Sequence, residues 1–466
     1  MDSILFPHRE SVLATAPALG QIALRDDRQK MSAGIARSGI WSRASTWGLL
    51  LLLLYFALDG VSPFLNAPTA LRAVATSSED GVLGERLSKL WMFLLCMIFV
   101  VQGHQAVRRL SMQMKLVTSF PILALLLFPV SQLATRTISS GALLLAAILL
   151  MYYIMSRYRF DELLELFLIL GTGTIAASIV FALALPQYGL DRMGGHATAW
   201  KGIFSAKNYL GDMAVFFLTM AVSYRGRTSF LRSVRVSQIV FCLVAIAFSR
   251  AATAYLLTAI YVVYFLIMKT LHRFRKKDYF VLCILLLGVL SVATLLIVAA
   301  PDLLFSALGK DSTLTGRTGI WSAAIDSIAR RPLLGYGYQA FWLGLEGESY
   351  HVILAVSWLL AQAQNGFLDV TLEMGAAGLA IVVLVFGFAF RDAGVCLFRS
   401  RDHAQLRAVE WYLAVVILTL ICNFDESFLF EPKHLGSMIF VIACVGLKQE
   451  WLRLQASAAR LRKDCP

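Results

Sequence analysis

The sequence predicts an all-α polytopic membrane protein with about 12 transmembrane helices. Hydrophobic residues make up 58% of its 466 residues and charged residues only 15%, whereas a soluble domain carries roughly a quarter charged residues. The mean hydropathy is +0.71. The apolar residues form runs near the ~20 residues that a spanning helix needs, and the basic residues lie between those runs. We therefore expect one membrane domain, 46–449, between cytoplasmic tails at 1–45 and 450–466.

The first tail contains RDDRQK and no long apolar core, so it does not have the pattern of a cleaved signal peptide. Twelve apolar runs follow it. Ser249 and Arg250 form a very short connection between the seventh and eighth runs, so these two could also be one broken pair. The predicted spans are 46–63, 88–103, 116–133, 138–155, 163–184, 207–223, 236–249, 252–269, 279–299, 367–390, 409–423 and 435–449.

The topology follows from the basic clusters, which hold most of the 42 Lys and Arg residues and recur at every second connection. Cytoplasmic loops carry such an excess, so both termini are expected in the cytoplasm of a bacterial inner membrane. The even number of spans agrees. Scattered in this way, the net charge of +13 does not indicate a nucleic-acid partner. The seven cysteines form no CxxC or CxxH pair, so neither a metal site nor a disulfide framework is expected.

Two long loops are then expected on the outside, at 186–207 and at 300–366, the second between helices 9 and 10. Loops of such length are uncommon unless they have a function. Within the second loop, WSAAIDSIARRP predicts a helix over 321–328 that ends before Pro332, followed by a turn rich in glycine.

Two arginines have a setting that fits the binding of phosphate. Arg317 lies in the outer loop before the glycine-rich PLLGYGY, and a guanidinium group binds phosphate oxygens bidentately. The alternative is an interfacial arginine that reaches lipid headgroups. Arg250 lies at the junction of two apolar runs, where an isolated charge is costly. Its alternative role is a structural ion pair with a buried acid such as Asp369 or Glu373.

Five segments, taken in order, resemble the O-antigen ligase and Wzy-type polymerase superfamily, most nearly its ExoQ-type exopolysaccharide polymerases. Each is weak alone, but their common order is fairly specific over about residues 190–430. The segments are WKGIFSAKNYLG (200–211), FSRAATAYL (248–256), the G-R-x-x-x-W and R-P-x-x-G-x-G pattern that begins at Gly316, QNGFLDVTLEMGAAGL (364–379) and NFDESF (423–428).

This resemblance implies a metal-independent glycosyl transfer, without a cofactor, at the outer face of the membrane. The donor would be an oligosaccharide on polyprenyl pyrophosphate, and family arginines bind that pyrophosphate. Arginines stabilise the negative charge that develops on such a leaving group. Carried over by motif, these are Arg250 and Arg317, with Arg192 matching less closely. Further substrate-binding candidates are Lys207, Asn365 and Asp369.

The family's proposed catalytic base, the histidine of its H-N motif, is Gln364 in this sequence. Glutamine can orient a hydroxyl by hydrogen bonding but does not take its proton. Candidate bases are therefore His351, His196, Asp369 and Glu373. The two acids lie four apart on one helix face, where an apolar setting would raise their pKa values. Alternatively, the histidines are solvated, the acids serve packing, or the chain binds sugars without transferring them.

The remaining motifs give weaker evidence of function. Asp425 and Glu426, followed by Lys433 and His434, neutralise an arginine, bind sugar hydroxyls or form a solvated turn. The glycines Gly375 and Gly378 of the fourth segment are expected to allow close helix packing.

Three kinds of function are compatible with these features. The first is a polymerase of lipid-linked repeat units, with a ligase that moves a finished glycan as its sibling. The second is a transporter or flippase, although we find no repeated halves of the kind that carriers show. The third is a non-catalytic sensor or scaffold. Expected partners are the lipid-linked oligosaccharide, membrane lipids and a chain-length regulator. An enzyme predicts that Arg250 and Arg317 converge under the outer loop.

Overall fold

The computed structural model describes residues 46–54, 79–191, 198–226, 228–271, 317–356 and 359–463. The chain divides into two units, 1–52 and 53–466. The described part of the first unit, 46–52, is helical. The elements described below belong to the second unit. The described residues are mostly helical, and seven of their helices are long and apolar enough to cross a membrane. The prediction of an all-α polytopic membrane protein is confirmed.

Seven predicted spans match these seven helices, with only 409–423 extending one residue beyond its helix, because long apolar runs are the strongest local signal for a spanning helix. The helices are α8 (Ala134–Arg157), α9 (Phe160–Ala184), α12 (Ser229–Ser249), α13 (Ala252–Leu271), α18 (Gly366–Arg399), α19 (His403–Cys422) and α20 (Leu435–Lys463).

Of three other predicted spans, two differ from the observed helices and the third coincides with a helix. The span 88–103 lies in α5 (Glu79–Gln102), which bends by 98° into α6 (His104–Gln113). The span 116–133 shortens to α7 (Lys115–Leu126), which contains a proline and is followed by a 3-10 turn at Phe128–Val130. The span 207–223 is α11 (Lys207–Ser223), 17 residues long.

The remaining two spans are not fully described. The span 279–299 lies outside the described residues, and 46–63 is described only over 46–54. The total of 12 and the membrane-domain bounds therefore stay predictions.

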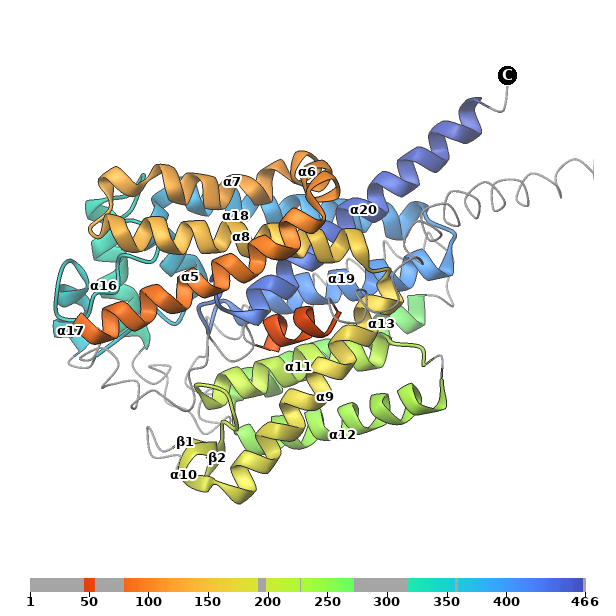
Figure 1. Ribbon diagram of the computed structural model, residues 1–466, viewed down its shortest axis with the longest axis horizontal. Coiled ribbons are helices and arrows are strands. Elements are labelled where there is room, and N and C mark those ends of the chain that lie inside the picture. The colour runs from red at the N-terminus through yellow and green to blue at the C-terminus, as the bar shows by residue number, and fades with distance from the viewer. Residues whose placement is uncertain are drawn as a thin grey trace, which may run out of the picture. The chain divides into compact units, whose positions relative to one another are not determined.

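Helix α11 forms the centre of one group of helices and is buried over most of its length. It packs against α9, α12, α13 and α19, while α8 packs against α5, α7 and α20. Figure 1 shows α7, α8 and α18 running alongside one another and α9 crossing beside α11 and α12. Close approach needs small residues here. A Cβ atom at Gly211 would lie 2.7 Å from the Ala254 Cβ atom.

Contacts between connecting segments show which helix ends lie close together, and these contacts define two groups of helix ends. At one end, which we call the site end, Arg136 donates to the Trp342 carbonyl oxygen (3.2 Å) and Asn208 Nδ2 to Glu426 Oε1 (2.5 Å). At the opposite end, Arg407 pairs with Asp161 at 2.7 Å. The described parts of the predicted outer loops lie at the site end, and the basic segments 157–159 and 391–407 lie at the opposite end. Which end faces the cytoplasm stays a prediction.

The described part of the loop 300–366 is folded. Its predicted helix is confirmed as α16 (Arg317–Arg330), which ends before Pro332, and a second helix, α17 (Ser349–Val356), packs on it. Ile320, Phe341 and Val352 belong to a buried apolar cluster between these elements. In the other loop, α10 (Pro186–Gly189) precedes the strands β1 (Leu190–Asp191) and β2 (Ala199–Trp200), which pair antiparallel.

Helix α18 is broken at Gly375, whose φ of 61° and ψ of −161° are non-helical. The glycine-rich turn after α16 lies in this break. Tyr336 N donates to the Leu372 carbonyl oxygen (2.9 Å) and Gly337 N to that of Glu373 (2.8 Å), while Ala376 N donates to the Pro332 carbonyl oxygen (2.8 Å). Gly375 therefore allows a close approach, as expected, but the element that approaches is the turn 332–337 and not another helix.

Candidate functional site

Arg317, the first residue of α16, lies at the centre of the candidate site. Its side chain is 10% exposed and forms an ion pair with Asp425, and its Nε donates to Gln364 Oε1 at 2.7 Å. Burial lowers the pKa of Arg317, an effect opposed by the acids Glu426 and Asp212. A guanidinium group nevertheless stays charged in proteins. The position of the family histidine, Gln364, thus contacts the arginine that the resemblance assigns to pyrophosphate.

The segment between α19 and α20 brings its acids to this arginine. Asn423 Oδ1 accepts hydrogen bonds from the backbone amides of Phe428 and Leu429, each at 3.0 Å, which holds the turn closed. The Gly366 amide donates to the carbonyl oxygens of Asn423 (2.9 Å) and Glu426 (3.0 Å). A Cβ atom at Gly366 would lie 3.0 Å from the Asn423 Cγ atom. The Gln-Asn-Gly motif and the last outer turn therefore fit together through their backbones.

Asp425 and Glu426 are both engaged in this site. Asp425 also accepts a hydrogen bond from the Thr253 hydroxyl, so it joins α16 to the first turn of α13. Glu426 accepts from Asn208, the second residue of α11. Burial raises the pKa of Glu426, although Asn208 and Arg317 act in the opposite direction. Of the three alternatives, neutralisation of an arginine is confirmed for Asp425, and the solvated turn is wrong.

Arg250 is exposed at the turn between α12 and α13, with a positive φ of 52°. It forms no hydrogen bond or ion pair with any residue in the described part of the chain, so the alternative of a pair with Asp369 or Glu373 is wrong there. Thr253 follows three residues later, which limits the backbone separation to about 11 Å. Thr253, at the start of α13, contacts the same carboxylate as Arg317, whereas Arg250 itself forms no hydrogen bond or ion pair with that carboxylate among the described residues.

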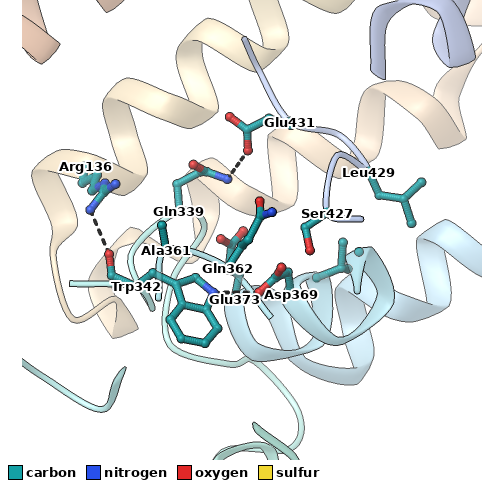
Figure 2. A pocket seen from close by; sticks show the side chains of 12 residues that line it. Arg136, Gln339, Trp342, Ala361, Gln362, Asp369, Glu373, Ser427, Leu429 and Glu431 are labelled. Carbon is teal, nitrogen blue, oxygen red and sulfur yellow. Dashed lines mark hydrogen bonds between the residues drawn. The ribbon is translucent and has the colours of Figure 1, made fainter. Parts of the chain in front are cut away.

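Asp369 and Glu373 line a neighbouring pocket of about 70 Å³ at the start of α18, as the helical spacing predicts. Asp369 accepts from Trp342 Nε1 (2.7 Å) and from the Ala363 amide (3.0 Å). Figure 2 shows the two acids within the ring of polar side chains. The residues lining the pocket are Arg136, Gln339, Trp342, Ala361, Gln362, Gly366, Asp369, Val370, Glu373, Ser427, Leu429 and Glu431.

Four lining residues were not predicted from the sequence: Arg136, Gln339, Gln362 and Glu431. They come from different segments of the chain, so no spacing links them. The one feature of the sequence that could have indicated them is composition, namely polar side chains close to a tryptophan in an outer loop.

Other predicted site residues have different positions. Asn365 caps α18: its Oδ1 accepts from the amides of Phe367 (3.1 Å) and Leu368 (3.2 Å). Lys207 is the first residue of α11, and its amide donates to Asp191 Oδ2 at 3.3 Å. His351 is exposed on α17, and within the described ranges no hydrogen bond joins it to Arg317 or Gln364.

The predicted candidates Arg192 and His196 lie outside the described residues.

His434 has a well-defined place beside the acids. Its ring is stacked between Tyr209 (centroids 4.2 Å apart) and Phe428 (4.7 Å), and its Nδ1 accepts from the Gly436 amide at 3.1 Å. Burial lowers the pKa of His434 to about 3. The ring is therefore neutral with its proton on Nε2, which makes it a hydrogen-bond donor at neutral pH.

The described residues contain no group of three or more His, Cys, Asp and Glu side chains that could hold a metal ion. Five of the cysteines are described, and all five are free and buried. Metal independence and the absence of a cofactor stay predictions.

Comparison with known proteins supports the resemblance. Residues 237–383 match the model of a family described as O-Antigen ligase. The chain is 28% identical over 285 residues to the exopolysaccharide production protein ExoQ of Rhizobium meliloti, covering 58% of this chain and 64% of that protein. It is 27% identical over 154 residues to an O-antigen ligase of Pseudomonas aeruginosa, covering 32% of this chain and 33% of that protein. The chain thus spans less than two thirds of the length of either relative. The predicted resemblance to this superfamily is confirmed.

Proposed function

We propose, from the match to the O-antigen ligase family, that this protein polymerises lipid-linked oligosaccharide repeat units into an exported polysaccharide. The donor is an oligosaccharide on polyprenyl pyrophosphate, and the reaction takes place at the outer face of the bacterial inner membrane, with both termini cytoplasmic. The observation that carries the proposal is the position of Arg317: it contacts Gln364 and Asp425, and Asp425 also contacts Thr253, which lies three residues after Arg250 in the chain.

Arg250 and Arg317 bind the pyrophosphate of the donor. In the transfer, the bond between the sugar's anomeric carbon and the pyrophosphate oxygen breaks, and the departing pyrophosphate keeps the electron pair. Fixed guanidinium groups stabilise that charge because they are oriented before the reaction begins. Asp425 must release Arg317 when the donor arrives, since a carboxylate and a phosphate compete for the same N–H donors. Arg192 and Lys207 are further candidates for the pyrophosphate.

The acceptor hydroxyl attacks the anomeric carbon and loses its proton to a base. Gln364 orients this hydroxyl, and Glu373 takes the proton. Glu373 is favoured because it lines the same pocket as Gly366. Gly366 directly follows Gln364 and Asn365 in the chain. Asp369 binds the substrate there. His351 is the alternative base, but it would have to move toward the site from its exposed position on α17.

The decisive experiment is reconstitution of the protein in liposomes with a polyprenyl-pyrophosphate oligosaccharide. Long-chain product indicates a polymerase, and its formation in the presence of EDTA tests metal independence. Arg317→Ala and Arg250→Ala are expected to abolish long chains at unchanged protein level. The matched control is Arg330→Ala on the same helix α16, since Arg330 pairs with Glu348 away from Gln364. Normal chain lengths in both arginine variants would refute the assignment.

A ligase is the second candidate, because the chain is also similar to the O-antigen ligase of Pseudomonas aeruginosa. The same assay separates the two: a ligase joins one glycan to a second acceptor without extending it. A transporter or flippase is less favoured, because carriers place their sites near the midplane of two matching halves, whereas these residues gather at one end of the helices. A chain-length regulator as partner stays a prediction.

A further inference from the structure

The pocket beside Arg317 has a composition that the binding of pyrophosphate does not explain. It is formed by five segments: the start of α8, the turn that follows α16, the segment before α18, the first turns of α18, and the turn before α20. It adjoins the arginine site directly, because the Asn365 amide donates to Ser427 Oγ at 2.9 Å and Gly366 lies between the two. Any group held in the pocket therefore lies against the segment 362–366, which also carries Gln364.

The acidic lining of the pocket disfavours an anion. The carboxyl groups of Asp369, Glu373 and Glu431 line it together with one cationic side chain, that of Arg136. A phosphate placed among these carboxylates would be repelled, and the repulsion is strong where water is scarce. The two sites thus suit different groups: the pyrophosphate of the donor at Arg317, and an uncharged group in the pocket.

The hydrogen-bonding groups of the pocket suit hydroxyls, which both donate and accept. Gln362 forms no hydrogen bond with any of the described residues, so its amide has donors and an acceptor free. Gln339 Nε2 donates to Glu431 Oε2 at 2.6 Å, which leaves the Gln339 oxygen as an acceptor. Trp342 adds an aromatic ring to the lining, and a few converging polar groups beside an aromatic ring are typical of small-molecule sites. Figure 2 shows Gln362 in the middle of the lining residues, between Gln339 and Asp369.

The volume of the pocket fits one sugar ring. A volume of about 70 Å³ holds roughly five water molecules at about 10–15 Å³ each. Five ordered waters occupy about the room of one sugar ring, whose hydroxyl oxygens would replace them.

We propose that this pocket binds one uncharged sugar ring of the acceptor glycan and holds its free hydroxyl next to Gln364. The inference rests on the proposed function for its role in transfer, but the binding itself can be measured without transfer. Gln362 and Glu431 act as binding residues for the hydroxyls, and the pocket selects against anionic groups.

The test measures binding to the full-length protein in nanodiscs by saturation-transfer NMR, with the methyl glycosides of glucose, galactose and mannose as probes. Inorganic pyrophosphate is the anionic probe. At least one glycoside is expected to bind saturably to the wild-type protein. Gln362→Ala and Glu431→Gln should each weaken that binding about fivefold or more, the effect of one lost hydrogen bond. Gln362→Asn is the conservative variant and should retain part of the binding.

The matched control is Glu346→Gln, which changes an exposed acid of the same outer loop and should leave glycoside binding within about twofold. Arg317→Ala should weaken pyrophosphate binding and leave glycoside binding unchanged. The inference is overturned if no glycoside binds, if binding is indifferent to Gln362→Ala and Glu431→Gln, or if pyrophosphate displaces the glycoside. Glycoside binding without any transfer from a polyprenyl-pyrophosphate donor would instead refute the proposed function and leave the pocket assigned.

Discussion

At the scale of single residues, the site is organised around one carboxylate. Asp425 binds both Arg317 and Thr253, so in the absence of substrate it neutralises the guanidinium group that the proposal gives to pyrophosphate. A half-buried acid in this position has two opposing effects. It stabilises the folded protein by pairing a buried charge, and it competes with the donor for the same N–H groups.

Asp425→Asn is expected to lower the KM for the polyprenyl-pyrophosphate donor by about fivefold or more, because a neutral amide competes less with the phosphate. The same change should lower the melting temperature, since Arg317 loses its counter-charge. Initial rates over a donor titration in liposomes and a thermal unfolding curve check the two effects. A raised KM would show that Asp425 positions Arg317 for the donor rather than competing with it.

Gln364→His is expected to remain active at neutral pH, because the one unprotonated nitrogen of a neutral imidazole can accept the Arg317 hydrogen bond or, once Arg317 has turned to the donor, take a proton. The adjacent cation lowers the pKa of the introduced histidine below its usual range. Activity should therefore be present above that pKa and fall as the pH drops below about 6, where the ring becomes protonated. Comparing pH–rate profiles of the variant and the wild type tests this. Complete inactivity at every pH would mean that the glutamine itself is required.

At the scale of elements, the break in α18 determines where the site lies. Gly375 has a backbone conformation that is essentially restricted to glycine. Gly335, with a φ of 66°, approaches the helix so closely that a Cβ atom would lie 2.6 Å from the Glu373 carbonyl carbon. These contacts hold the glycine-rich turn against the start of α18, and so they place Gln339 and Trp342 beside Asp369 and Glu373.

Gly375→Ala is expected to destabilise the protein by about 2–4 kcal/mol, from backbone strain together with a clash against the Leu333 backbone. The matched control is Gly387→Ala in the same helix, where a Cβ atom would meet nothing within 4 Å. That control should be neutral or stabilising by up to about 1 kcal/mol. Thermal unfolding in one detergent gives both values. Equal stability of the two variants would contradict the role assigned to the break.

The elements also show what the sequence predicts well. The apolar runs of α8, α9 and α19 are visible because hydropathy is a local property. The short α7, with Pro121, and the bend after α5 were missed, because whether such a segment crosses a membrane depends on its neighbours. Similarly, the motif arginines could be selected by resemblance. Pairing between Arg317 and Asp425, 108 positions apart, depends on the tertiary fold, as does the pocket around Gln362.

At the scale of the whole second unit, the two groups of helix ends carry different chemistry. The site end has the candidate pyrophosphate and sugar sites, and the opposite end has the ion pair of Arg407 with Asp161 and that of Arg453 with Glu450. Since basic loops face the cytoplasm in most membrane proteins, the site end is expected to face outward.

An impermeant maleimide tests this orientation in whole cells. Glu346→Cys, at the exposed tip of the outer loop, should react without permeabilisation, and Arg401→Cys, exposed at the opposite end, should react only after it. The five described native cysteines are buried and free, so they should contribute little background, and replacing Cys283 and Cys465 by serine removes the other two. The reverse labelling pattern would place the site on the cytoplasmic side.

The turn 332–337, which lies in the break of α18, also limits which segments can be removed from the protein. The backbone groups freed by the break, the carbonyl oxygens of Leu372 and Glu373 and the amides of Ala376 and Ala377, find their partners in residues 332–337. Excising that turn would leave these groups unsatisfied in apolar surroundings, at a cost of several kcal/mol for each group in lipid. The segment that reads as a detachable extramembrane insertion is therefore an integral part of the membrane scaffold, and a trimmed version without it should not fold.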